Sequence, residues 1–83
     1  MIRTSIVMKE ESRLDRSAAC RLVQEASAFA CTLTLETPRG VVNAKSMLGL
    51  LSLAMNQPTS MTLVADGPDE EAASRRMAEL MAR

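Results

Sequence analysis

Histidine, tryptophan and tyrosine are absent from this chain, and Phe29 is its only aromatic residue. Without histidine the protein cannot carry a phosphoryl group on an imidazole, and it lacks the side chain that most often serves as an acid or base near neutral pH. Without large aromatic rings, the core must be built from leucine, alanine, valine and the seven methionines, methionine being an adaptable filler. These absences exclude imidazole chemistry but leave enough apolar residues for a packed domain.

Charge of one sign is not in excess, because ten basic residues balance ten acidic ones. Nothing in the composition therefore favours nucleic acid or an anionic membrane as a partner. The chain has no apolar run long enough to span a bilayer and no signal-type apolar core at its N-terminus. Cys20 and Cys31 lack the spacing of a metal site, and we expect both to be reduced and buried. These features predict a cytoplasmic protein without metal, cofactor, direct nucleic-acid contact or membrane contact.

Eighty-three residues suffice for a single domain, expected to span 1–83. Alternating apolar and polar residues predict strands, and apolar residues at i, i+3, i+4 and i+7 predict helices. The expected strands cover 2–8, 31–36, 40–43 and 61–65, and the expected helices cover 16–28, 46–55 and a last segment capped by Asp69. The order βαββαβα with hairpin connections predicts an α+β, open-faced two-layer sandwich, with a four-stranded antiparallel sheet and three helices on one face.

The stretch 41–53 is the most informative part of the chain. Two valines lead through a short polar loop to Ser46, which stands directly before a run of apolar residues. A serine there can cap a helix by accepting backbone N–H bonds with its hydroxyl. Met47, Leu48 and the leucines that follow cannot all face one core at 3.6 residues per turn. Part of this helix should therefore form an apolar recognition patch beside Ser46.

This stretch resembles the regulatory-serine signature of the HPr family, the small phosphocarriers of the bacterial phosphotransferase system. The resemblance covers nearly the whole chain without a gap, since 22–26 resembles the family's first helix and 65–72 the entry to its last helix. It implies that a serine kinase phosphorylates Ser46 and that the helix after it docks partner proteins. The expected partner-binding residues are Met47, Leu48 and Leu51, with a polar rim of Arg16, Arg21 and Gln24. Lys45 is a further expected partner-binding residue, which could pair with a phosphate on Ser46 or with an acidic partner.

The active-site pattern of the family is not kept. That pattern is glycine, an aliphatic residue, histidine, alanine, arginine and proline, whereas this chain reads Arg13-Leu14-Asp15-Arg16-Ser17-Ala18. Asp15 occupies the position of the histidine, and Ser17 that of the assisting arginine. The chain thus resembles the catabolite-repression HPr-like proteins, which lack the histidine and keep the serine. Once serine-phosphorylated, those proteins act as corepressors for a LacI-type transcription regulator.

We therefore expect a regulatory or binding module and not an enzyme. Its expected partners are proteins: a serine kinase/phosphorylase, a transcription regulator or a component of the phosphotransferase system. One alternative is a variant phosphocarrier that forms an acyl phosphate on Asp15, and another is an adaptor that binds its partner without modification. We favour a helix cap for Asp15, because aspartate accepts N–H bonds from a first helical turn. The chain is expected to be a monomer or a weak dimer.

Overall fold

The computed structural model describes residues 1–7, 15–56 and 60–81, with the side chains of 54–56 excepted. The predicted strands and helices are present with small shifts at their ends, and the expected end of the first strand at Met8 lies outside the described residues. The elements are β1 (Ile2–Val7), α1 (Arg16–Ser27), β2 (Thr32–Thr37), β3 (Gly40–Asn43), α2 (Met47–Asn56), β4 (Ser60–Asp66) and α3 (Glu70–Met81).

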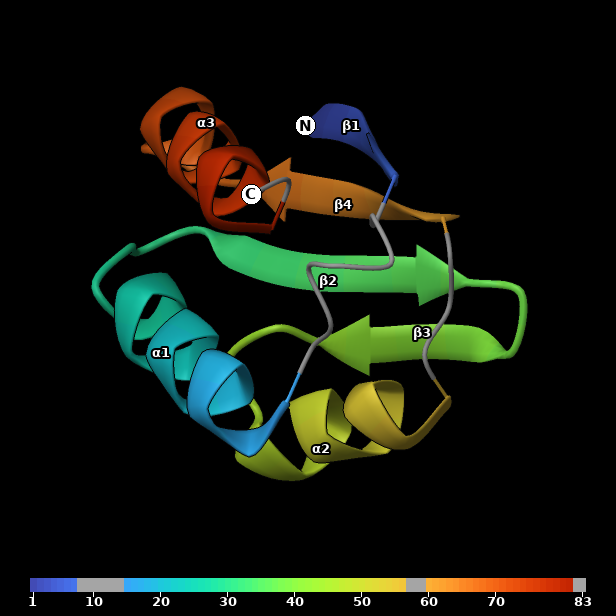
Figure 1. Cartoon of the computed structure of the whole chain (residues 1–83). Coiled ribbons are helices and arrows are strands. Elements are labelled where there is room, and N and C mark those ends of the chain that lie inside the picture. The colour runs from blue at the N-terminus through green and yellow to red at the C-terminus, as the bar shows by residue number, and fades with distance from the viewer. Residues whose placement is uncertain (8–14, 57–59, 82–83) are drawn as a thin grey trace.

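The strands form one antiparallel sheet in the order β1-β4-β2-β3, and the helices lie on one face of it (Figure 1). β1 pairs along β4, with Ile2 opposite Ala65 and Val7 opposite Ser60. β2 pairs with β4 on one side and, through a hairpin, with β3 on the other. The prediction of an α+β open-faced sandwich is confirmed.

Alternate strand residues point toward the helices and form the core. Leu33, Leu35 and Leu63 are fully buried there, and burying each such leucine stabilises the fold by about 1.5–3 kcal/mol. Within this layer α3 packs against β1 and β4, α2 packs against β3, and α1 contacts both other helices. The helices contribute Ala19, Leu22 and Ala26 from α1, Leu50 and Leu53 from α2, and Ala73, Met77 and Met81 from α3.

Two helices begin at the side-chain caps that the sequence predicts. Oδ1 of Asp15 accepts the N–H of Ala18 at 2.8 Å at the start of α1. Oγ of Ser46 accepts the N–H of Gly49 at 3.2 Å at the start of α2. Each bond satisfies an amide that has no partner within the helix. Both predicted caps are confirmed.

The third predicted cap is wrong. The carboxylate of Asp69 turns away from α3 and accepts the N–H groups of Ala30, at 2.8 Å, and Cys31, at 2.9 Å. Only the carbonyl of Asp69 belongs to the helix, accepting the N–H of Ala73 at 3.0 Å. Asp69 therefore ties the loop between α1 and β2 to the start of α3.

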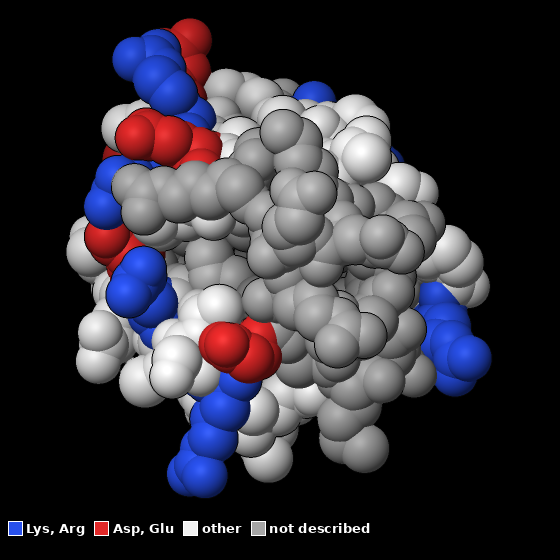
Figure 2. All heavy atoms as spheres, in the orientation of Figure 1, with Lys and Arg blue, Asp and Glu red and all other residues white. Residues whose placement is uncertain are grey.

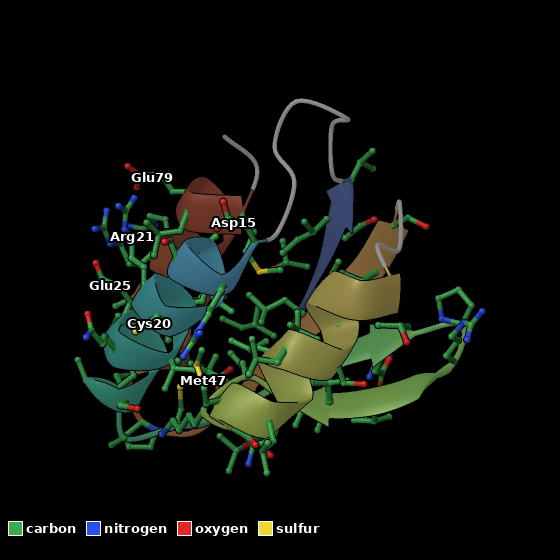
Figure 3. All side chains as sticks on the ribbon, turned by 60° about the horizontal axis from the view of Figure 1, so that its bottom comes forward. Asp15, Cys20, Arg21, Glu25, Met47 and Glu79 are labelled. Carbon is green, nitrogen blue, oxygen red and sulfur yellow. The ribbon has the colours of Figure 1, made fainter. Side chains whose placement is uncertain are left out.

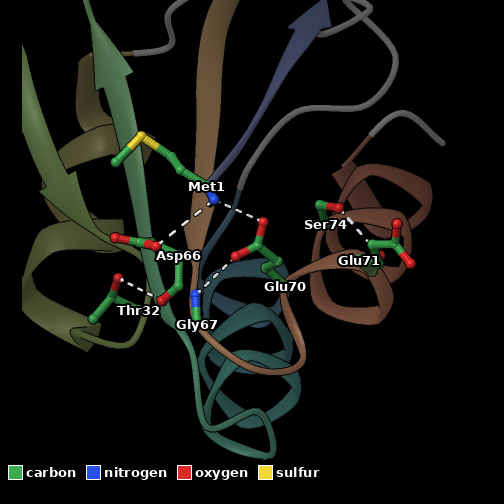
Figure 4. A network of polar contacts seen from close by, with 7 residues as sticks. All are labelled: Met1, Thr32, Asp66, Gly67, Glu70, Glu71 and Ser74. Atoms are coloured by element: carbon green, nitrogen blue, oxygen red, sulfur yellow. Dashed lines mark hydrogen bonds and ion pairs between the residues drawn. The ribbon is translucent and has the colours of Figure 1, made fainter.

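The side chain of Glu70 makes the contacts with neighbouring residues at the start of α3 (Figure 4). Its Oε1 accepts the N–H of Gly67 at 3.1 Å, and its Oε2 lies 2.8 Å from the N-terminal ammonium of Met1. The bond to Met1 and the bond from Gly67 lower the pKa of Glu70, and the same carboxylate raises the pKa of the Met1 ammonium. Met1, the residue before β1, is in this way joined to the corner between β4 and α3.

An ion pair crosses the face of the sheet opposite the helices. Arg3 of β1 binds Glu36 of β2, although β4 lies between these strands. Arg3 stands opposite Val64 and Glu36 stands opposite Thr62, so the pair runs diagonally over β4. Val64 is only 7% exposed on this open face, which is consistent with cover from the crossing side chains.

Candidate functional site

The turn from β3 into α2 holds Ser46 by both its backbone and its hydroxyl. Oδ1 of Asn43 accepts the N–H of Lys45 at 2.9 Å, and the Asn43 carbonyl accepts the N–H of Ser46 at 3.0 Å. The Ser46 hydroxyl is bonded to Gly49, and the Ser46 carbonyl accepts the N–H of Leu50 at 3.0 Å. Ser46 remains partly exposed at the positive end of the helix. That end favours an anion by about 0.3–1 kcal/mol.

Gly49 allows the first turn of α2 to approach β3 closely. A Cβ at this position would lie 2.8 Å from Cγ1 of Val42 and 3.3 Å from the carbonyl oxygen of Asn43. A side chain at this position would require the Val42 side chain or the helix to shift. Gly49 was not among the predicted site residues. The signal that could have identified it is its place inside a helix, where glycine costs about 1 kcal/mol relative to alanine.

The side chain of Lys45 connects the Ser46 turn to α1. Its Nζ donates to the carbonyl of Phe29 at 2.7 Å, and the N–H of Phe29 donates to the carbonyl of Ala26 at the end of α1. A cation at this point meets the partial negative charge of a helix C-terminus. The Lys45 ammonium, predicted to face a phosphate or a partner, is thus bound inside the domain in this structure.

The apolar run of α2 is divided between core and surface. Leu50 and Leu53 are buried, whereas Leu48 is 82% exposed. Met47 and Leu51 are half-buried and pack against the core, with Met47 between α1 and α2 (Figure 3). The patch expected from Met47, Leu48 and Leu51 therefore consists of one exposed leucine beside two side chains that also contribute to the interior.

Asp15 lies exposed at the N-terminal end of α1 (Figure 3). One of its carboxylate oxygens is engaged by Ala18. A carboxylate can in principle form an acyl phosphate, but the residue two positions later, where the family has its arginine, is the neutral and exposed Ser17. The arrangement at this helix end is that of a cap.

The polar residues predicted for the rim lie on two sides of α1. Residues four apart share a helix face, so Arg21 lies with Glu25, and Oε1 of Glu25 is 2.6 Å from Arg76 of α3. Figure 3 shows Arg21 on the same side as Glu25 and Glu79, toward α3 rather than α2. Arg16 lies about 140° from Arg21 around the helix axis, on another exposed side, and Gln24 lies between the two.

Cys20 was not predicted as a site residue, and the prediction that it is buried is wrong. It is an exposed free thiol that stands four residues from both Arg16 and Gln24. The core side of α1 is formed by Ala19, Leu22 and Ala26, and at 100° per residue position 20 turns away from it. Cys31, by contrast, is buried as predicted and also free.

Charges of both signs are interspersed along the flank formed by α1 and α3 (Figure 2). Arg76 is central to this flank, lying 2.6 Å from Glu25 and 3.8 Å from Glu79. The bond to Glu25 raises the pKa of the Arg76 guanidinium. Among the described residues, no cluster of three or more His, Cys, Asp or Glu side chains could hold a metal ion, and no helix is long and apolar enough to cross a membrane.

The sequence and the fold are similar to those of known proteins. The family model for the PTS HPr component phosphorylation site matches residues 2–83. The chain is 37% identical over 78 residues to the HPr-like protein Crh of Bacillus subtilis (strain 168), covering 94% of this chain and 92% of that protein. It is 35% identical over 80 residues to the phosphocarrier protein HPr of Xylella fastidiosa (strain 9a5c), covering 96% and 90%. The crystal structure of HPr-C-His from Thermoanaerobacter tengcongensis superposes with a TM-score of 0.86 at 34% identity, covering 98% of this chain and 91% of the other.

Proposed function

This chain belongs to the HPr family, and on that basis we propose that it is a cytoplasmic regulatory and binding protein of the bacterial phosphotransferase system that carries no phosphate on histidine. The observation that carries the proposal is the complete lack of histidine. At the position of the family's histidine, Asp15 caps α1 by binding the N–H of Ala18. Lack of an imidazole supports a role exerted through the proteins that this chain binds.

Regulation is assigned to Ser46, the target of a serine kinase/phosphorylase. Its hydroxyl is partly exposed and lies at the start of α2, where it accepts the N–H of Gly49. A phosphoryl group adds about −1.5 to −2 charges, and the positive end of the helix is a favourable place for them. The fold need not change on phosphorylation, because the new charge is added at a surface that is already formed.

Partner docking is assigned to α2 and the adjoining side of α1. Leu48 is the apolar anchor, because a side chain that is 82% exposed in the free protein can be buried by a partner. A phosphate on Ser46 would then offer a charge-assisted hydrogen bond to an arginine or lysine of a transcription regulator or another system component. Such a bond contributes about 1.5–3 kcal/mol. The remaining docking residues are Met47, Leu51, Arg16 and Gln24, whereas the Lys45 ammonium donates to the Phe29 carbonyl and Arg21 faces α3.

The proposal is tested by asking from which donor the protein accepts phosphate. Labelled phosphoenolpyruvate with the upstream phosphotransferase enzyme should leave the chain unlabelled. Labelled ATP with an HPr-specific serine kinase should label it, and Ser46→Ala should abolish that label. Ser52→Ala is the matched control, since Ser52 is an exposed serine of the same helix, and this variant should be labelled like the wild type.

Each alternative has its own result in the same experiment. A label from phosphoenolpyruvate that is lost in Asp15→Ala would show a variant phosphocarrier using an acyl phosphate. No label from either donor, with partner binding retained, would show an adaptor that works without modification.

A further inference from the structure

Lys45 precedes the proposed phosphorylation site and makes two hydrogen bonds within the domain. Its backbone N–H is bound by Oδ1 of Asn43 in the turn before α2. Its ammonium group is bound by the carbonyl of Phe29, in a segment 16 residues earlier, and this contact is partly buried. Lys45 is therefore held at both ends, once by its own turn and once by the end of α1.

The bond to Phe29 is of a strong kind. Phe29 lies two residues beyond the end of α1, and its N–H donates to the carbonyl of Ala26, one of the last carbonyls of the helix. A lysine ammonium here gains a charge-assisted hydrogen bond and a favourable interaction with the helix C-terminus. The Ser46 turn is in this way fastened to α1 on one side, while Gly49 seats it against Val42 of β3 on the other.

We propose that Lys45 is a positioning residue for Ser46, which holds the hydroxyl in the orientation that a serine kinase needs. The inference rests on the proposed function of Ser46. In the reaction the Ser46 oxygen bonds to the γ-phosphorus of ATP, the bond from that phosphorus to the β,γ-bridging oxygen breaks, and ADP leaves. The hydroxyl proton goes to a base of the kinase. Such transfer depends on in-line placement of the attacking oxygen, so a loosened turn lowers its rate.

Three variants separate positioning from charge. Lys45→Met removes the charge and the donor but keeps the length of the apolar stem, and Lys45→Arg restores a charged donor. Arg39→Met removes one positive charge from the exposed turn between β2 and β3, away from the contact with Phe29. Cooperative unfolding of each variant in urea checks that the domain is folded. Two readouts follow: hydrogen exchange of the Ser46 and Gly49 amides in the isolated protein, and kcat and KM for labelling by an HPr-specific serine kinase with ATP.

With Lys45→Met we expect exchange at Ser46 and Gly49 to accelerate and kcat to fall, each by about tenfold, as loss of one charge-assisted bond implies. KM should change less, Lys45→Arg should recover both values, and Arg39→Met should resemble the wild type. A lower labelling rate with unchanged exchange at Ser46 would overturn the inference, because it would mean that the kinase reads the lysine directly. Failure of the arginine variant to recover either value would also overturn it.

Failure of the proposed function gives a different result. If the wild type takes no label from ATP, Ser46 is not the kinase site and the regulatory proposal fails. The amide exchange of the isolated protein still decides the role of Lys45 in that case. Unchanged exchange at Ser46 in Lys45→Met would then overturn the inference, and faster exchange would uphold the positioning of the hydroxyl.

Discussion

Gly67 and Cys31 pack backbone against backbone. A Cβ on residue 67 would lie 2.6 Å from both Cα and Cβ of Cys31, and the φ angle of Gly67 is +152°. Both observations require glycine, the first for space and the second for conformation. The same corner holds the Asp69 carboxylate on the N–H of Cys31. The loop between α1 and β2 is therefore fastened to the start of α3 by one close contact and one carboxylate.

Replacing Gly67 by alanine should destabilise the fold through overlap as well as backbone strain. Gly40→Ala is the matched control, because φ at Gly40 is +138° but no atom beyond its chain neighbours lies within 4 Å of the added Cβ. Backbone strain costs about 1–3 kcal/mol in either variant, and the overlap at Gly67 adds about 1–3 kcal/mol. Urea denaturation measures both free energies of unfolding. Equal losses in the two variants would show that the corner relaxes to accept the methyl group.

The Asp69 carboxylate should make stability depend on acidity. The N–H groups of Ala30 and Cys31 lower its pKa in the folded protein, whereas the unfolded chain keeps the ordinary value of about 3.9. The contribution of Asp69 to the free energy of unfolding is therefore complete when the pH is above the ordinary pKa. It is lost as the pH falls through the lower pKa of the folded protein. The stability difference between the wild type and Asp69→Asn should be largest at neutral pH and should shrink below about pH 4. A difference that stays constant through this range would contradict the assignment.

The two cysteines should differ sharply in reactivity. Cys20 is exposed, whereas Cys31 is buried, and burial together with the Asp69 carboxylate raises the pKa of the Cys31 thiol. Because the thiolate is the reactive form, one thiol of the folded protein should react with an alkylating reagent at neutral pH and the second only in denaturant. Cys20→Ser should remove the fast reaction. Fast modification of both thiols in the folded wild type would be incompatible with this structure.

Substitutions of Leu48 and Leu50 should affect different properties, the first partner binding and the second the stability of the fold. Leu50→Ala removes a fully buried side chain and should lower the free energy of unfolding by about 2–5 kcal/mol. Leu48→Ala removes an exposed one and should change stability by less than about 0.5 kcal/mol, yet it should weaken partner binding in both states of Ser46. Thermal unfolding and titration calorimetry give the two quantities. Partner affinity that is insensitive to Leu48 would place the docking surface elsewhere on the molecule.

Short-range sequence patterns were sufficient to predict the helices and strands and two of the helix caps. The alternation of apolar and polar residues in β2 and the capping roles of Asp15 and Ser46 depend on residues within a few positions of one another. Patterns over such short distances can be read directly from the sequence. The exposure of Cys20 could also have been predicted, because helical spacing places it with Arg16 rather than with the core.

Contacts between residues that are distant in the sequence could not be predicted from it. Asp69 has every local mark of a helix cap, but its carboxylate binds amides 38 and 39 residues away. Lys45 looks like a free cation beside Ser46, and only the packing of α1 against α2 brings the Phe29 carbonyl to it. In both cases the side chain bonds to a partner that is distant in sequence.

The position of β1 at the edge of the sheet sets an order of events during synthesis. Its neighbour in the sheet is β4, so Ile2 must find Ala65 with most of the chain between them. Such pairings form late, because closing a long loop lowers the chain entropy before the new contacts can stabilise the structure. On the ribosome β1 emerges first and waits until β4 has been made, with its hydrogen-bonding groups open to any other strand that comes near. The first strand of this domain to be synthesised is thus among the last to be secured.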